Sequence, residues 1–341
     1  MKNNIPKNAI IFFILLASIL GLAGCGNTVN LVNATIENTV IIEIPIHIST
    51  VRGDGVYFVT NAEIFSSKDY LTVTRISLDD GDMQTTIVPY DLRLANVQAF
   101  YVTEYGDFKF FIRMSGEYAL LLYDPVADVM NYTVITDALF FGAERRLVRH
   151  AEFTRDGNLF VAAWQGDMEK GDDALLFDQD GNLLGEIDLD NYFISDMAQA
   201  ADDQLFLRGW PAGIEDYEIY EEGDVFFFGI SRGIDPQTGA LTDTVLMENF
   251  QPRDGSWISR LYSAAPGGAF DLYFDLVVDD VQILHGITLE TGTIRPLLNW
   301  AELDIPPPHR EQSVYFFSDG RIATFQHNET WRELVIISLI T

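Results

Sequence analysis

A short turn followed by an apolar strand recurs six times along the chain. Glycine and acidic residues form the turn, and β-branched and aromatic residues fill the strand, as is typical of β-structure. The strands begin at Val56, Phe108, Asn158, Gln204, Ala269 and Arg321, and each of these residues is called the marker of its unit. Their spacings are 52, 50, 46, 65 and 52 residues, so one structural unit is repeated with a mean period of 53 residues.

Five of these units also contain a second turn, between two further apolar strands. These turns read LDDGD, DPVAD, DQDGN, DPQTG and LETG and begin at Leu78, Asp124, Asp178, Asp235 and Leu289. Asp, Pro, Asn and Gly suit tight hairpins, which need preset or positive φ angles. Each unit therefore holds four antiparallel strands. We expect an all-β fold, a six-bladed β-propeller over residues 39–341, with a pair of β-sandwiches as the alternative.

The repeated units resemble the blades of six-bladed propellers of the broad TolB and NHL-like kind. The resemblance covers Thr39 to Thr341 and concerns architecture, because the chain has no Gly-His…Trp-Asp pair of the WD40 type. The chain is also similar to the propeller segment that precedes solute-binding domains in some Gram-positive lipoproteins. That similarity implies a role beside an uptake system for carbohydrates or other solutes.

The sixth unit contains only three strands before the chain ends. One strand is left over at the other end of the repeat region, TVIIEIPIHI from Thr39 to Ile48. We expect this strand to pair with the last strand, residues 332–341, because the pairing closes the ring and covers a strand edge that would otherwise invite aggregation. Pro45 should then lie at the end or on the outer edge of the closing strand.

The first 25 residues resemble a bacterial lipoprotein signal. Lys2 and Lys7 precede an apolar run that is too short to span a bilayer comfortably, and the run ends in Leu-Ala-Gly-Cys at Cys25. This pattern predicts a signal peptide at residues 1–24, and a lipidated cysteine with a flexible tether at residues 25–38. The protein would then be extracytoplasmic and anchored to the bacterial cell membrane through the lipid on Cys25. The alternative is a free thiol in an ordinary signal anchor.

The charge of the chain is strongly acidic. Without residues 1–24, which hold two lysines and no acid, 19 basic and 51 acidic side chains remain, a formal balance of −32. Such a surface repels nucleic acids and anionic lipid head groups. We therefore exclude nucleic-acid binding. Electrostatics alone would not hold this protein on a membrane.

Candidate binding residues come from equivalent positions in the units. Propellers tend to bind ligands on one face, and the loops between the second and third strands open there. Trp164, Trp210, Asp275 and His327 each lie six residues after a unit's marker. Aromatic faces beside a few polar groups suit a carbohydrate-like ligand. The alternative is that these residues pack against the loops.

Two further groups of residues are candidates for the same face. The long fourth unit holds an insertion, GIEDYEIYEEGD, in which Tyr217 and Tyr220 alternate with acids. It would either bind a cationic or sugar partner or be a solvated loop. Arg149 and His150 precede the expected innermost strand of the third blade, and Arg260 lies near the corresponding start in the fifth. These bases would either hold an anion at the channel or pair with nearby acids.

Catalytic motifs are absent from the sequence. It contains no Gly-x-Ser-x-Gly and no His-Glu-x-x-His, and its single cysteine is assigned to the lipid. We expect no cofactor, with calcium as the alternative. The DQDGN turn has calcium-type ligands, but its glycine stands at the fourth place, not the sixth as in an EF-hand loop. The leading hypothesis is a non-enzymatic propeller that binds a ligand. The alternatives are an envelope assembly scaffold and a metal-dependent, lactonase-like hydrolase or lyase.

Overall fold

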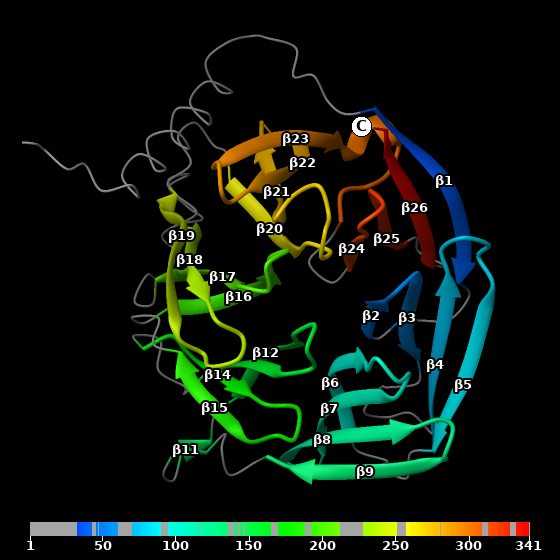
Figure 1. Cartoon of the computed structure of the whole chain (residues 1–341), viewed down its shortest axis with the longest axis vertical. Helices are drawn as coiled ribbons and strands as arrows, with labels where there is room; N and C mark the ends of the chain where they lie inside the picture. Colours follow the sequence, from blue (N-terminus) through cyan, green and yellow to red (C-terminus); the bar gives the residue numbers. More distant parts are fainter. Residues whose placement is uncertain are drawn as a thin grey trace, which may run out of the picture.

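The computed structural model of the chain is a six-bladed β-propeller, with each blade an antiparallel sheet of four strands (Figure 1). The structure describes residues 33–42, 46, 48–60, 70–89, 95–114, 116–135, 140–141, 144–145, 147–164, 170–187, 192–211, 228–250, 257–279, 281–308, 313–327 and 332–340. The only helix among these residues is η2 (Trp300–Leu303), a single 3-10 turn. None of the described helical structure is long and apolar enough to cross a membrane. The expected fold is confirmed, and the sandwich alternative is excluded.

The first three blades follow one another along the chain. Blade one contains β2 (Ile48–Arg52), β3 (Gly55–Thr60), β4 (Tyr70–Ser77) and β5 (Met83–Pro89). Blade two contains β6 (Ala95–Val102), β7 (Phe108–Met114), β8 (Glu117–Asp124) and β9 (Val129–Val134). The small hairpin of β10 (Phe140–Phe141) and β11 (Glu144–Arg145) then precedes blade three, which contains β12 (Leu147–Phe153), β13 (Leu159–Trp164), β14 (Asp172–Phe177) and β15 (Leu183–Ile187).

The last three blades complete the ring. Blade four contains β16 (Tyr192–Gln199), β17 (Leu205–Pro211), β18 (Phe228–Ile234) and β19 (Leu241–Phe250). Blade five contains β20 (Trp257–Ser263), β21 (Leu272–Val278), β22 (Val281–Thr288) and β23 (Thr293–Asn299). Blade six contains β24 (Val314–Phe316), β25 (Arg321–His327), β26 (Arg332–Ile340) and β1 (Asn33–Ile42). The first strands of neighbouring blades contact one another, so β2, β6, β12, β16, β20 and β24 surround the central axis.

The recurring turn of the sequence is a recurring backbone geometry. In blades two, three, four and six, the turn between the first two strands closes with the same two backbone hydrogen bonds. Gly106, Gly157 and Gly320 occupy the same place in three of these turns, with φ of 89°, 78° and 89°. Glycine adopts such positive φ values without steric cost, which explains its recurrence in the sequence. Asp203 takes this place in blade four, with φ of 72°.

The buried hydrophobic residues of the described ranges form six clusters, one between each pair of neighbouring blades. The last cluster joins blade six to blade one. Ile42, Phe325 and Leu334 pack there against Val56 and Phe58. Because every blade buries both of its faces, no blade is expected to be stable alone.

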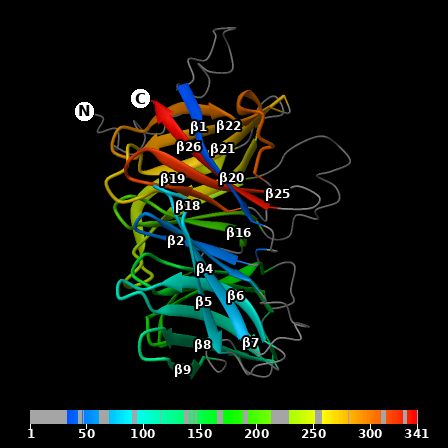
Figure 2. The same cartoon turned by 90° about the vertical axis from the view of Figure 1, so that its right-hand side faces the viewer.

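The ring is closed by the pairing of the two ends of the repeat region, as expected. β1 runs antiparallel to β26, from Asn33 opposite Ile340 to Ile42 opposite Arg332, and Figure 2 shows the two strands side by side. The bounds of the closing strand differ from the prediction of 39–48. Pairing begins at Asn33, inside the segment expected to be a tether, and Ile48 already belongs to β2. The Asn- and Thr-rich segment was misjudged because backbone pairing to β26 does not require apolar side chains. Pro45 lies outside the described residues.

Candidate functional site

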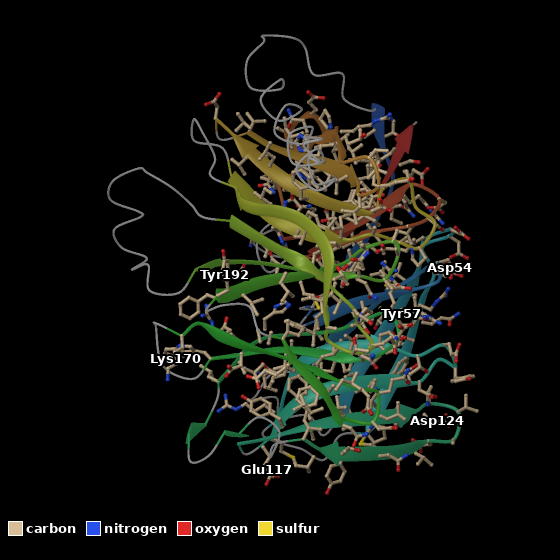
Figure 3. The ribbon with its side chains drawn as sticks, turned by 60° about the vertical axis from the view of Figure 1, so that its left-hand side comes forward. Asp54, Tyr57, Glu117, Asp124, Lys170 and Tyr192 are labelled. Atoms are coloured by element: carbon tan, nitrogen blue, oxygen red, sulfur yellow. The ribbon has the colours of Figure 1, made fainter. Side chains whose placement is uncertain are left out.

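The propeller has two unlike faces. The turn face carries the tight turns between the first and second and between the third and fourth strands of each blade. The loop face carries the connections between the second and third strands and between blades. Figure 3 shows Asp54 and Asp124 at the turn face and Lys170 and Tyr192 at the loop face.

The tryptophans and His327 lie on strands that end at the loop face. Trp164 is the last residue of β13, is partly buried and lies opposite Asp172. Trp210 lies in β17 opposite Phe193, and His327 ends β25. The side chains of Trp210 and His327 fall outside the described structure, and a binding role for the three residues stays a prediction. Cys25, Tyr217 and Tyr220 also lie outside the described residues.

Asp275 is not at the loop face, where its sequence position placed it. It lies in the middle of β21, fully buried between blades five and six. Its carboxylate accepts hydrogen bonds from the Tyr262 hydroxyl, from Trp300 Nε1 at 2.9 Å and from Gln282 Nε2 at 2.8 Å. Burial raises the pKa of Asp275, against the opposing effect of these donors. Asp275 therefore links β21 to β20, to β22 and to η2 in the core, and it does not lie at the loop face.

Arg149, His150 and Arg260 lie within the innermost strands, and the expectation that the first two precede the strand was wrong. The inner strands of four successive blades share a β-bulge, at Gln98 in β6, Arg149 in β12, Ser195 in β16 and Ser259 in β20. A bulge redirects the side chains around it. The residues that follow the bulge are therefore equivalent in blades three, four and five: His150, Asp196 and Arg260.

Most of the charge near these bulges is paired. Arg149 Nη1 lies 3.7 Å from Asp172 Oδ1, and the Arg149 guanidinium lies 5.0 Å from the centre of the Phe193 ring. The buried Arg208 binds Asp196 through Nε and donates from Nη1 to the carbonyl of Ile258 at 3.0 Å. Arg149 therefore pairs with an acid in the described structure, as the pairing alternative expects.

His150 faces several carboxylates. Its Nε2 atom lies 3.5 Å from Glu152 Oε2. Burial alone would lower the pKa of His150, but Glu152, Asp196 and Asp172 outweigh it and raise that pKa above its usual 6.5. Because its neighbours are carboxylates, His150 faces acids and not an open anion site.

A cavity on the turn face is the candidate ligand site. It is a groove of about 720 Å³ between blades two and three, within the range of ligand pockets. Tyr101 and Tyr105 lie at the end toward the axis, and Leu120 and Leu122 of β8 lie along the outer part. The rest of the lining is polar: Arg52, Thr103, Glu104, Asp107, Lys109, Asn131, Thr133, Arg155, Asp156, Asn158, Gln179, Asp180 and Gln237.

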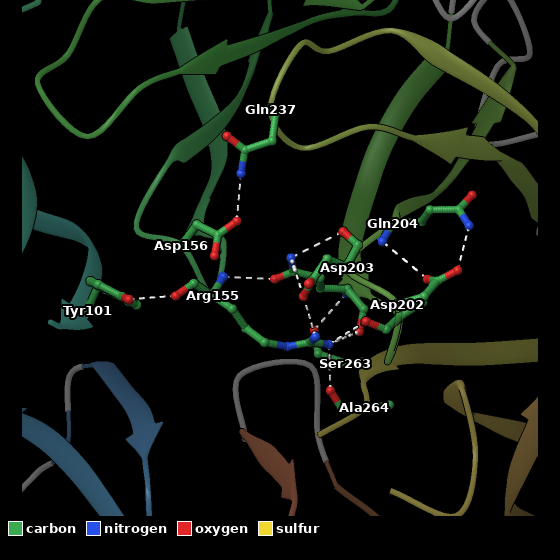
Figure 4. A network of polar contacts seen from close by, with 11 residues as sticks. Tyr101, Arg155, Asp156, Asp202, Asp203, Gln204, Gln237, Ser263 and Ala264 are labelled. Atoms are coloured by element: carbon green, nitrogen blue, oxygen red, sulfur yellow. Dashed lines mark hydrogen bonds and ion pairs between the residues drawn. The ribbon is translucent and has the colours of Figure 1, made fainter. Parts of the chain in front are cut away.

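Arg155 organises the axial end of this groove (Figure 4). Its guanidinium donates to Asp203 Oδ1 at 2.6 Å and to the carbonyls of Gln199, Ala200 and Ala264, at 3.0 Å for Gln199 and 2.7 Å for Ala264. The Tyr101 hydroxyl donates to the Arg155 carbonyl at 2.5 Å. The Arg155 side chain thus ties the turn of blade three to blades four and five, and the Tyr101 side chain adds blade two.

Lys109 lies in the wall of the groove and is only 5% exposed. Its ammonium donates to the carbonyls of Gly157 at 3.1 Å and Gln179 at 2.5 Å. Burial lowers the pKa of Lys109 to about 8, although the nearby Asp180 opposes the shift. Lys109 therefore connects blade two to blade three and fixes the width of the groove.

The DQDGN sequence is a hairpin turn, as expected. Asp178 Oδ1 accepts from the backbone N–H groups of Asp180 and Asn182, at 2.9 and 2.8 Å, and these bonds contribute to the lowered pKa of Asp178. Within the described residues, no three His, Cys, Asp or Glu side chains are arranged to hold a metal ion.

The groove was not predicted from the sequence, because its lining comes from the repeated turns themselves. Asp107, Asp156 and Asp180 are turn residues, and each was interpreted only as turn chemistry. The signal was present: the turn residues of blades two and three combine acids with neighbouring tyrosines and amides, which a turn alone does not require.

No protein-family model matches the chain, and neither does any curated protein. Among solved structures, virginiamycin B lyase from Staphylococcus aureus is 13% identical over 90% of this chain and 100% of its own, with a TM-score of 0.44. TolB from Acinetobacter baumannii is 15% identical over 83% of this chain and 64% of its own, also at 0.44. A luciferin-regenerating enzyme is 10% identical over 89% of this chain and 96% of its own, with a TM-score of 0.45. Likenesses of this size say nothing of ligand or activity, and the assignment as a six-bladed propeller rests on the strand pairing itself.

Proposed function

We propose that this protein is a lipid-anchored, extracytoplasmic propeller that binds a linear, carbohydrate-like ligand in the turn-face groove without transforming it. The observation that carries the proposal is the groove itself, which joins two tyrosines to a wall of amides, hydroxyls and carboxylates. Tyrosine faces stack on sugar rings, and amides and carboxylates bind their hydroxyl groups. The proposed binding site lies on the turn face, whereas the sequence predicted a binding site on the loop face.

The rigidity of the groove also supports a binding role. Arg155 and Lys109 hold its walls through hydrogen bonds to five backbone carbonyls and Asp203. A preformed site loses little conformational entropy when a ligand enters, so affinity does not require a large buried area.

A matched pair of tyrosine variants tests the site. Tyr105 lines the groove and is 82% exposed, whereas Tyr132 of β9 is 66% exposed and lies outside the lining. The full chain is titrated calorimetrically with linear oligosaccharides of four to six rings, in a polyoxyethylene detergent that contains no sugar. Tyr105→Ala is expected to weaken binding about tenfold, through the loss of about 1.4 kcal/mol of stacking, and Tyr132→Ala less than twofold. If an oligosaccharide binds wild type and Tyr105→Ala with the same affinity, the proposed site is contradicted. If no oligosaccharide binds, the assembly scaffold is favoured.

The lipid anchor has its own test. The signal-like segment and Cys25 support it, and intact-mass measurement of the protein made in a bacterium is the readout. We expect the mature chain to begin at Cys25 and to carry lipid there, and Cys25→Ser to keep residues 1–24 and lose the lipid. A wild-type mass that still includes Met1 would contradict the anchor.

A further inference from the structure

We propose that the turn-face groove selects an oligosaccharide that carries protonated amines, that is, an amino-sugar polymer in its deacetylated form. This inference rests on the proposed function and names its ligand class. It is carried by the balance of hydrogen-bond donors and acceptors in the lining.

Two of the three basic side chains in the groove already donate to the protein. Arg155 donates to Asp203 and to three carbonyls, and Lys109 donates to two carbonyls. Neither guanidinium nor ammonium is therefore oriented to receive an acidic ligand. Arg52 is the remaining cation, and it comes from blade one at the axial end.

The acids of the groove are less engaged than the bases. Asp156 accepts one hydrogen bond from Gln237 Nε2 at 2.7 Å. In the described structure, no base forms an ion pair with Asp107 or Asp180. Glu104 is the fourth carboxylate, and its hydrogen bond with Tyr105 raises the pKa of that tyrosine. The groove thus presents acceptors in excess of free donors, and a ligand that supplies charged donors complements it.

The surroundings reinforce the same sign of charge. A second pocket of about 360 Å³ shares Asp156 and Gln237 with the groove and adds Asp202, Asp203 and Asp235. The whole chain carries a formal charge of −30, which accelerates the encounter with a cationic ligand. The tyrosines at the axial end favour a cation as well, since an ammonium group is attracted to an aromatic face.

The wall of the groove argues for a saccharide over a merely cationic chain. Leu122 of β8 is 37% exposed and lies opposite Asn131 of β9, and Thr133 of β9 lies opposite the buried Leu120. An exposed apolar side chain beside an amide and a hydroxyl matches the apolar face and the hydroxyl edge of a sugar ring.

The test uses two ligands that differ only in acetylation: a β-1,4 tetramer of glucosamine and its fully N-acetylated form. Both are titrated calorimetrically into the full chain at pH 6.0, with 50 and 500 mM NaCl. We expect the free-amine tetramer to bind at least tenfold tighter at low salt and to lose most of that advantage at high salt. Tetralysine is the third ligand, because it carries four charges without sugar rings, and we expect it to bind at least tenfold more weakly than the amine tetramer.

Three variants locate the effect. Asp107→Asn and Asp180→Asn are each expected to weaken binding of the amine tetramer three- to tenfold and to leave the acetylated tetramer unchanged. Glu117→Gln is the matched control, because Glu117 is exposed at the start of β8 and lies outside the groove lining. It removes the same charge from the protein and is expected to change neither affinity.

The outcomes separate the two proposals. Equal affinity for both tetramers, with loss of both in Tyr105→Ala, would overturn the selection for amines and leave the proposed function standing. Tetralysine binding as tightly as the amine tetramer, or an equal effect of Glu117→Gln and Asp107→Asn, would overturn the inference as diffuse charge attraction. If neither tetramer binds, the inference is overturned. If, in addition, the affinity of every other oligosaccharide tested is unchanged by Tyr105→Ala, the proposed function is overturned as well.

Discussion

Truncation of Ile42 to alanine is expected to lower the free energy of unfolding by about 3 kcal/mol, as is typical of a large aliphatic side chain removed from a packed core. Ile42 is the last residue of β1 and is 4% exposed. It packs with Phe58 of blade one and with Phe325 and Leu334 of blade six. The variant therefore weakens the seam at which the ring closes. Urea unfolding followed by circular dichroism and tryptophan fluorescence is the measurement.

The neighbouring residue gives the control. Ile41 lies on the same strand with its side chain on the opposite face and is 47% exposed. Ile41→Ala removes the same atoms from the same strand, and we expect it to cost less than about 1 kcal/mol. If both variants cost the same, or if Ile42→Ala costs less than 1 kcal/mol, β1 does not close the ring as the structure shows.

The location of the seam gives this strand more influence than its length suggests. β1 and β26 come from opposite ends of the described chain, yet they share one sheet. Each of the six hydrophobic clusters joins two blades, so opening one seam exposes apolar surface on both sides. We therefore expect Ile42→Ala to lower the unfolding midpoint without separating the two probes.

The repeat itself was predictable because its cause is local. The tight turns with positive φ at Gly106, Gly157 and Gly320 can be recognised in the sequence by their glycines. The period of these turns then gives the number of blades. The closing pair was predictable from an unpaired strand at each end. Its bounds were not, because Asn33 to Asn38 pair through backbone groups that any side chain permits.

The site was harder to predict because the direction of a side chain depends on register. Asp275 shows this: the connection between β20 and β21 is eight residues long, residues 264–271, whereas that between β12 and β13 is five, residues 154–158. Counting six residues from each marker therefore reached the end of β13 at Trp164 but only the middle of β21 at Asp275. One change in turn length moved a candidate ligand-binding group into the core.

The inner-strand bulges illustrate a second limit. The segments Val97-Gln98-Ala99, Val148-Arg149-His150, Ile194-Ser195-Asp196 and Ile258-Ser259-Arg260 share a position in four blades but share only the apolar first residue. A bulge is fixed by strand pairing, and no residue type marks it reliably. The equivalence of His150, Asp196 and Arg260 therefore emerges only from the pairing register.

Acidification from pH 7 to pH 4 is expected to cost the protein up to about 3 kcal/mol of stability through one buried histidine. His285 lies in β22, is 4% exposed and stacks on Phe274 with ring centres 5.3 Å apart. Its Nδ1–H donates to the carbonyl of Ile283 at 2.9 Å. Burial lowers the pKa of His285 to about 4, against the smaller opposing effect of that hydrogen bond.

The sign of the effect follows from proton binding. The unfolded chain protonates this histidine near pH 6.5 and the folded chain near pH 4, so the unfolded state binds more protons between these values. The stabilising contribution is therefore present above pH 6.5 and is lost as the pH falls toward 4. A difference of about 2.5 pKa units corresponds to about 3 kcal/mol, at about 1.4 kcal/mol for each unit.

A non-titrating variant isolates this contribution from the other groups. His285→Asn keeps a donor near the position of Nδ1 and removes the proton equilibrium. Two other effects increase the stability of the fold as the pH falls: the raised pKa of His150 and the relief of the large negative charge. Both effects are the same in wild type and in the variant, so they cancel in the comparison. We expect the stability difference between wild type and variant to shrink by about 3 kcal/mol from pH 7 to pH 4, measured by urea unfolding at intervals of half a pH unit. Parallel pH profiles would show that His285 is not the buried neutral group of blade five, because only a group whose pKa differs between the two states makes their difference depend on pH.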